Sequence, residues 1–96
     1  MGATTFFTSV KSKSAEEAFR AAKTESRFNF GHAGYTGTIA EKPSFVVIPL
    51  PTGVDPEDYA SKLIDKRDMR IDNKWGPAGC FEMTGNEYYF FGWASC

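Results

Sequence analysis

The sequence holds 96 residues, of which 42% are hydrophobic and 16% aromatic, and its formal net charge is −1. A chain of this length predicts one domain, residues 1–96, with a modest core in which aromatic side chains supply much of the buried area. Without a large excess of positive charge, the composition disfavours a DNA- or RNA-binding role.

Targeting signals and metal motifs are not evident in the sequence. No apolar segment approaches membrane-spanning length, and the first residues lack the basic and apolar regions of a signal peptide. The cysteines Cys80 and Cys96 and the single histidine, His32, do not have the spacing of a metal site. We therefore expect a cytoplasmic protein with reduced thiols, no membrane contact, no metal and no cofactor.

The chain begins with a predicted strand and helix. Ala3–Val10 is rich in Thr, Phe and Val, which suit a pleated surface, and so predicts a strand. Ser14 and Glu17 have the spacing of a capping box, which predicts a helix that runs to about Phe28.

Two more strands and a second helix are expected next. Thr36–Lys42 is compatible with a strand that Pro43 breaks, and residues 44–48 are apolar on both faces, as in a central strand. Asp55 and Pro56 are typical of a helix cap and a first helical position. The expected buried stripe of this helix comprises Tyr59, Leu63 and Ile64.

The last part of the chain predicts a hairpin. Residues 80–84 and 87–93 alternate as strands, and Gly85 and Asn86 form the turn between them. The resulting order is β-α-β-β-α-β-β. It favours an α+β domain with a mostly antiparallel sheet of about five strands and with both helices on one face.

The stretch from Gly31 to Lys42 is the strongest candidate for a functional surface. Its glycines recur every third residue, at Gly31, Gly34 and Gly37, which matches neither a P-loop nor a dinucleotide fingerprint. A helix terminator followed by a turn and a strand glycine is the favoured explanation of the pattern, ahead of a turn that cradles phosphate through backbone N–H groups. His32 is suited to acid–base chemistry at neutral pH or to a structural hydrogen bond to the backbone.

Charged and aromatic residues outside the glycines carry further hypotheses. Glu41 and Lys42 alternate along the expected strand and are interpreted as a solubilising pair on an edge strand. Lys74 and Trp75 lie in a loop rich in Gly and Pro. Trp75 is suited either to anchoring an interface or to covering the end of the core, and the sequence leaves both open.

The run Gly31-His32-Ala33-Gly34-Tyr35-Thr36-Gly37-Thr38-Ile39-Ala40-Glu41-Lys42, followed by Phe45-Val46-Val47, resembles short uncharacterised proteins encoded by tailed bacteriophages. Residues 74–80 and 89–94 are similar to such proteins as well. The resemblance covers most of the chain. It implies a phage or prophage origin and a bacterial cytoplasm, and it transfers no activity to particular residues.

The resemblance and the absence of a catalytic cluster together favour a non-enzymatic binding protein. It would act on a host or defence component, by inhibiting a protein or by sequestering a nucleotide-like small molecule, and a homo-oligomer is left open. The expected binding residues are His32, Tyr35, Thr36, Thr38, Glu41, Lys42, Lys74 and Trp75. The alternative is a small enzyme with His32 as general acid or base, and with Glu41, Tyr35 or Cys80 brought close by folding.

Overall fold

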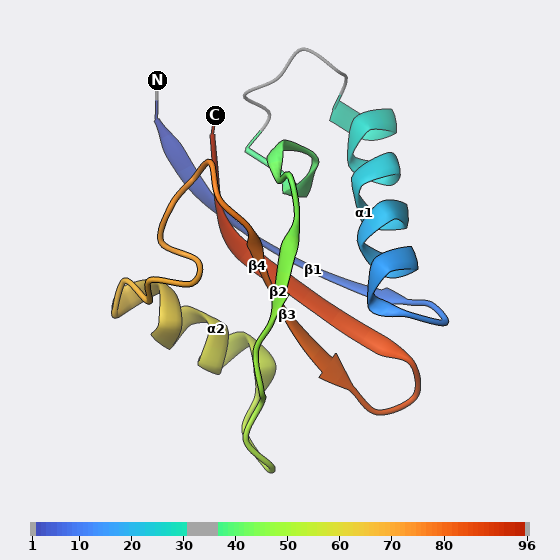
Figure 1. The fold of residues 1–96 in the computed structure, drawn as a ribbon, viewed down its shortest axis with the longest axis vertical. Helices are drawn as coiled ribbons and strands as arrows, with labels where there is room; N and C mark the ends of the chain where they lie inside the picture. The colour runs from blue at the N-terminus through green and yellow to red at the C-terminus, as the bar shows by residue number, and fades with distance from the viewer. Residues whose placement is uncertain (1, 31–36, 96) are drawn as a thin grey trace.

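The computed structural model describes residues 2–30 and 37–95 and confirms the α+β class (Figure 1). The elements in chain order are β1 (Ala3–Lys11), α1 (Ala15–Phe30), the 3-10 helix η1 (Ile39–Glu41), β2 (Phe45–Val47), α2 (Pro56–Asp65), β3 (Ala78–Met83) and β4 (Glu87–Ser95).

The four strands form one mixed sheet with the order β1-β4-β3-β2. The outer strand β1 pairs antiparallel with β4 along its whole length, from Ala3 opposite Ser95 to Lys11 opposite Glu87. The hairpin from β3 to β4 is the expected one, and Asn86 in its turn has a φ of 59°. The short strand β2 runs parallel to β3 at the other edge, so the sheet is antiparallel except for this pair.

Helix starts follow the expected capping chemistry. The Ser14 hydroxyl accepts a hydrogen bond from the Glu17 backbone N–H at 3.2 Å, one residue before α1 begins. The Asp55 carboxylate accepts one from the Asp58 N–H at 3.1 Å, and Pro56 occupies the first position of α2. Both caps satisfy backbone donors that the first helical turn leaves without intrahelical partners.

The expected strand at Thr36–Lys42 is wrong over its described part, residues 37–42. These residues form a bend and then η1 instead, and the sheet of the described residues has four strands, close to the expected number of about five. The Thr38 hydroxyl accepts from the Ala40 N–H at 3.3 Å and caps η1, while Ile39 is only 1% exposed. Local capping by Thr38 and burial of Ile39 thus outweigh the strand preference of Thr and Ile.

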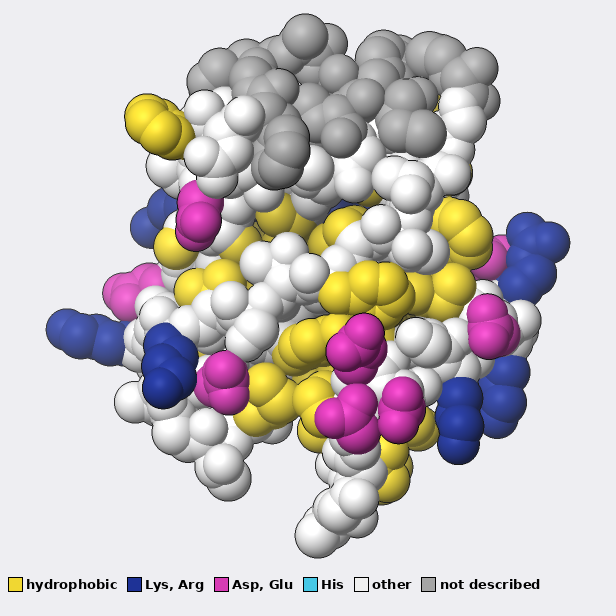
Figure 2. Space-filling model, turned by 180° about the vertical axis from the view of Figure 1, so that it is seen from behind, with side chains coloured by type: hydrophobic (Ala, Val, Ile, Leu, Met, Phe, Trp, Pro, Cys, Tyr) yellow, Lys and Arg dark blue, Asp and Glu magenta, His cyan; other side chains and the backbone are white. Residues whose placement is uncertain are grey.

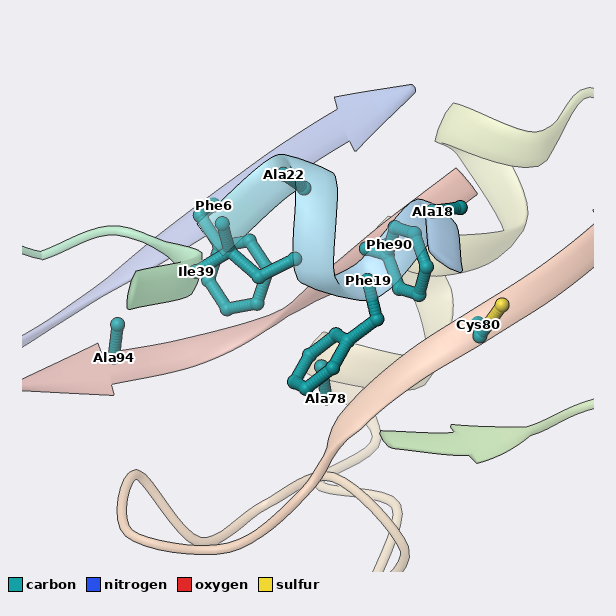
Figure 3. Packing of buried hydrophobic residues seen from close by; sticks show 9 residues of the cluster. All are labelled: Phe6, Ala18, Phe19, Ala22, Ile39, Ala78, Cys80, Phe90 and Ala94. Atoms are coloured by element: carbon teal, nitrogen blue, oxygen red, sulfur yellow. The ribbon is translucent and has the colours of Figure 1, made fainter. Parts of the chain in front are cut away.

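The two helices cover opposite faces of the sheet, which corrects the expectation that both lie on one face (Figure 1). Alternate residues of β3 and β4 enter two separate core clusters. Cys80 and Phe90 pack with α1 and η1, whereas Phe81 and Phe91 pack with α2. Figure 3 shows the first cluster, in which side chains from β1, α1, η1, β3 and β4 meet. Because both faces of the central strands are apolar, each face needs its own covering layer.

Coverage by α2 leaves part of its face of the sheet open to solvent. Phe7 of β1 is 40% exposed and lies against Tyr89 of β4, with ring centroids 6.4 Å apart. Seen from behind, hydrophobic side chains form a band across the middle of the molecule, and acidic side chains gather near its lower border (Figure 2). Within residues 2–30 and 37–95, neither helix has the length and apolar composition needed to span a membrane.

Candidate functional site

The expected binding residues fall into two groups. His32, Tyr35 and Thr36 lie outside the described residues. The others, Thr38, Glu41, Lys42, Lys74 and Trp75, come from two segments far apart in the sequence. The structure brings these segments together at the end of the molecule that carries both chain termini (Figure 1).

The first of these segments, residues 37–42, is fixed to the core at several points. The Gly37 N–H donates to the Ser95 carbonyl at 2.8 Å, and Gly37 has a φ of 71°, a conformation that favours glycine. Thr38 then caps η1, and the Lys42 N–H donates to the Ile39 carbonyl at 3.0 Å. Thr38 therefore contributes to this candidate site by shaping the backbone.

Lys42 is buried, with 1% of its surface exposed, and it is the link between the two segments. Its ammonium donates to the backbone carbonyls of Asn73 at 3.2 Å and Lys74 at 3.4 Å. Burial lowers the pKa of Lys42 from 10.5 to about 8, because desolvation disfavours the charged form. The solubilising role expected for Lys42 on an edge strand is therefore wrong, since its side chain braces a neighbouring loop.

That neighbouring loop, residues 72–77, is called the tryptophan loop below. Its turn is closed by two hydrogen bonds that Asn73 accepts: its side-chain oxygen from the Trp75 N–H at 2.8 Å, and its carbonyl from the Gly76 N–H at 2.9 Å. The Lys74 ammonium donates to the Gly2 carbonyl at 3.3 Å. The loop is thus held by its own turn, by Lys42 from inside and by the N-terminal segment from outside.

Trp75 stands on this braced loop with 53% of its surface exposed. The Lys74 ammonium lies 5.2 Å from the centre of a Trp75 ring, within the range of a cation–π contact. About half of Trp75 is therefore open to solvent, and its role as an interface anchor stays a prediction. An indole whose backbone is already ordered loses little conformational freedom when a partner covers it.

Glu41 belongs to a different side of this end of the molecule. Its charge acts on Lys23 of α1, where it partly offsets a lowered pKa. Desolvation is the main cause of that lowering, and Arg27 adds to it by repulsion. The charge of Glu41 therefore acts on Lys23 of α1, whereas Lys42 reaches toward the tryptophan loop.

Cys80 is not suited to act as a nucleophile with His32. The thiol is fully buried in β3, and burial raises its pKa to about 12, so it stays protonated at neutral pH. In the described part of the chain, no group of three or more His, Cys, Asp or Glu side chains could hold a metal ion. His32 itself lies outside the described residues.

The structure also has a groove between α1 and residues 43–45, and none of the described residues that line it is among the binding residues expected from the sequence. It has a volume of about 500 Å³, and its lining includes Arg20, Lys23 and Arg27. The signal for it was present in the sequence, because these cations are spaced three and four residues apart and so share one side of a helix. What the sequence did not indicate is which segment would face them.

Comparison with known protein families, characterised proteins and solved structures found no match to this chain.

Proposed function

We propose that this chain is a small phage-encoded binding protein that acts without catalysis, by docking on a protein of the host or of its defence systems. The observation that carries the proposal is the exposed Trp75 on a loop braced by Lys42. Trp is among the residues that contribute most binding energy at protein interfaces. The phage origin and the host or defence target rest on the resemblance of the sequence to tailed-phage proteins.

The surroundings of Trp75 favour a partner with an acidic or hydrogen-bond-accepting rim. Lys74 lies against Trp75 and leaves the indole half exposed, so an acceptor from the partner can meet the ammonium while an apolar group covers the ring. Rim charges of this kind set orientation and association rate more than affinity.

The test is affinity capture from bacterial lysate with the wild-type chain and a Trp75→Ala variant. A protein retained by the wild type should not be retained by Trp75→Ala. When this partner is purified, its affinity for Trp75→Ala should be at least about tenfold lower than for the wild type, because truncating an interface anchor costs about 2 kcal/mol or more. Met69→Ala is the matched control, since Met69 is 96% exposed and hydrophobic but lies outside the tryptophan loop.

Two results would overturn the proposal. One is a wild-type sample that retains no protein beyond those retained by Trp75→Ala. The other is a partner lost from Phe7→Ser but kept by Trp75→Ala, which would move the contact surface to the open part of the sheet beside β1. Circular dichroism of each variant must match the wild type, so that loss of capture is not loss of folding.

A further inference from the structure

The groove between α1 and the segment leading into β2 is lined by an unusual concentration of positive charge. Arg20 and Arg27 are two helical turns apart, about 10 Å along α1, and Lys23 lies between them on the same side. Among the described residues that line the groove, Glu16 at the N-terminal end of the helix is the one carboxylate. The groove is therefore locally cationic although the whole chain has a net charge of −1.

These cations have no ion-pair partner within residues 2–30 and 37–95, where both salt bridges lie in the turn after α2. Glu41 acts on Lys23 through its charge and partly offsets the lowered pKa of Lys23, and Arg27 repels the same ammonium. An anion placed between Lys23 and Arg27 would reduce this repulsion. Two side-chain hydroxyls, from Thr24 and Ser44, line the same space and can donate to anionic oxygens.

The floor of the groove is aromatic and firmly packed. Phe19 of α1 and Phe45 of β2 lie with ring centroids 5.0 Å apart, and each also contacts Phe90 of β4, at 5.6 and 5.8 Å. Figure 3 shows Phe19 reaching from α1 toward the sheet. Ser44 is held at the rim because its carbonyl accepts from the Ala78 N–H at 2.9 Å. Phe19 is only 9% exposed and the Lys23 ammonium lies 5.3 Å from the centre of its ring, so the half-buried Phe45 supplies the accessible aromatic surface beside the cations.

We propose that this groove binds a small phosphate ester that carries a planar ring, of the size of a nucleoside monophosphate. Arg and Lys side chains are the usual partners of phosphate, and the aromatic floor provides a surface for the ring. The groove volume of about 500 Å³ lies within the range of ligand sites. This inference does not depend on a protein partner at Trp75, because the lining of the groove contains no residue of the tryptophan loop.

Adenosine monophosphate, adenosine and inorganic phosphate are the probes that test this site. Titrations followed by calorimetry at low salt should give saturable binding of adenosine monophosphate. Its affinity should be at least about tenfold higher than that of either fragment, because the phosphate and the ring each contribute to binding. The affinity should fall as salt is added, since the phosphate contacts are electrostatic and lie in an open groove.

Variants locate the binding in the groove. Arg20→Gln combined with Arg27→Gln should weaken binding of adenosine monophosphate at least about tenfold through loss of two phosphate partners. Lys62→Gln combined with Lys66→Gln removes the same charge at α2, on the other face of the sheet, and should leave the affinity unchanged. Phe45→Leu should lower the affinity toward that of inorganic phosphate, and Trp75→Ala should have no effect.

Three outcomes would overturn the proposal. Equal affinities for adenosine monophosphate and adenosine would show that the cations do not hold the phosphate. Equal affinities for adenosine monophosphate and inorganic phosphate would show a general anion site without a ring surface. Equal losses in the two double variants would show that bulk charge, and not this groove, attracts the ligand. Because Trp75 is outside the groove, failure here is distinguishable from failure of the docking function.

Discussion

Lys42 is a buried side chain that holds an exposed surface in place, because it fixes the backbone of the tryptophan loop from inside the molecule. Its aliphatic part lies inside the molecule beside Gly92, and its ammonium meets the carbonyls of Asn73 and Lys74. Within the described residues no carboxylate accepts from Lys42, and backbone carbonyl dipoles compensate its charge there. This arrangement is sensitive to the protonation state of Lys42.

The pH dependence of stability should report the buried state of Lys42. The group titrates at 10.5 when exposed and at about 8 in the fold, so between these values the unfolded chain holds a proton that the folded chain has released. The contribution of Lys42 to the free energy of unfolding therefore rises with pH through this window. Between about pH 8 and about pH 10, we expect the free energy of unfolding of the wild type to rise by about 2 kcal/mol relative to that of Lys42→Met.

Urea denaturation of both proteins at the two pH values measures this shift. Comparing the proteins cancels the other groups that titrate in the alkaline range, including Cys80 and Tyr89, whose pKa values burial raises to about 12. A stability difference that stays constant with pH would mean that Lys42 is solvated in the fold.

At the scale of elements, η1 is the piece that joins the candidate site to the core. Ile39 enters the cluster beneath α1, together with Phe6, Ala22 and Ala94. The same short helix positions Glu41 so that its charge acts on Lys23 of α1, and it directs the next residue, Lys42, toward the tryptophan loop. Ile39 is therefore the large apolar side chain that anchors η1 in this cluster, beside the hydrogen bonds made by Gly37, Thr38 and Lys42.

Ile39→Ala should destabilise the protein by about 3 kcal/mol, because it removes buried methyl groups and leaves a cavity under α1. Ile39→Val is the matched variant and should cost about 1 kcal/mol, since it removes a single methylene. Urea or thermal unfolding gives both values. Equal stabilities of Ile39→Ala and the wild type would show that η1 is not anchored through this side chain.

The elements also show which parts of the fold could be predicted from the sequence. Both helix starts were predictable because Ser14 and Asp55 act through local hydrogen bonds whose spacing the sequence displays. The hairpin at Gly85 and Asn86 was predictable for the same local reason. The strand prediction at Thr38 was wrong because Thr is compatible with two local structures. Its backbone can pair in a sheet, but here its hydroxyl caps η1 instead.

Long-range features were beyond the sequence. The parallel pairing of Phe45 with Ala78 depends on where the chain returns after α2, which no local pattern specifies. The placement of the helices on opposite faces was indicated only indirectly, by strands that are apolar on both sides. The burial of Lys42 and the convergence of α1 cations with Phe45 arise from tertiary packing, so the candidate groove could not be found from residue spacing alone.

At the scale of the whole molecule, β3 and β4 join the two core clusters into one unit. Neighbouring residues of β3 alternate between the clusters, with Cys80 beneath α1 and Phe81 beneath α2. If the helix on either face were lost, one apolar face of β3 and β4 would be exposed to solvent. The helix on the other face packs on these same strands, so its packing would be weakened too. We expect the domain to unfold as a single cooperative unit.

The Cys80 thiol is a reporter for this cooperativity. Cys80 is fully buried, and its backbone carbonyl accepts a hydrogen bond from the Ile48 N–H at 2.9 Å. In the sheet it is paired with Val47 of β2 on one side and with Phe90 of β4 on the other. The Cys80 thiol is inaccessible to solvent, and its raised pKa keeps it protonated and unreactive. A thiol reagent should therefore react with it only when the sheet opens. In a Cys96→Ser variant, labelling of Cys80 in native buffer should be at least about a thousandfold slower than in the unfolded chain.

The dependence of this labelling on urea separates global from local opening. If both clusters open together, the free energy of opening derived from labelling should fall with urea at the same slope as the free energy of unfolding from circular dichroism, because the slope scales with the surface exposed. A Cys80→Ser variant that retains Cys96 provides the signal of the other thiol for comparison. Labelling of Cys80 that is rapid in native buffer, or that does not respond to urea below the unfolding transition, would show that the β2 edge opens independently and that the two layers are not one cooperative unit.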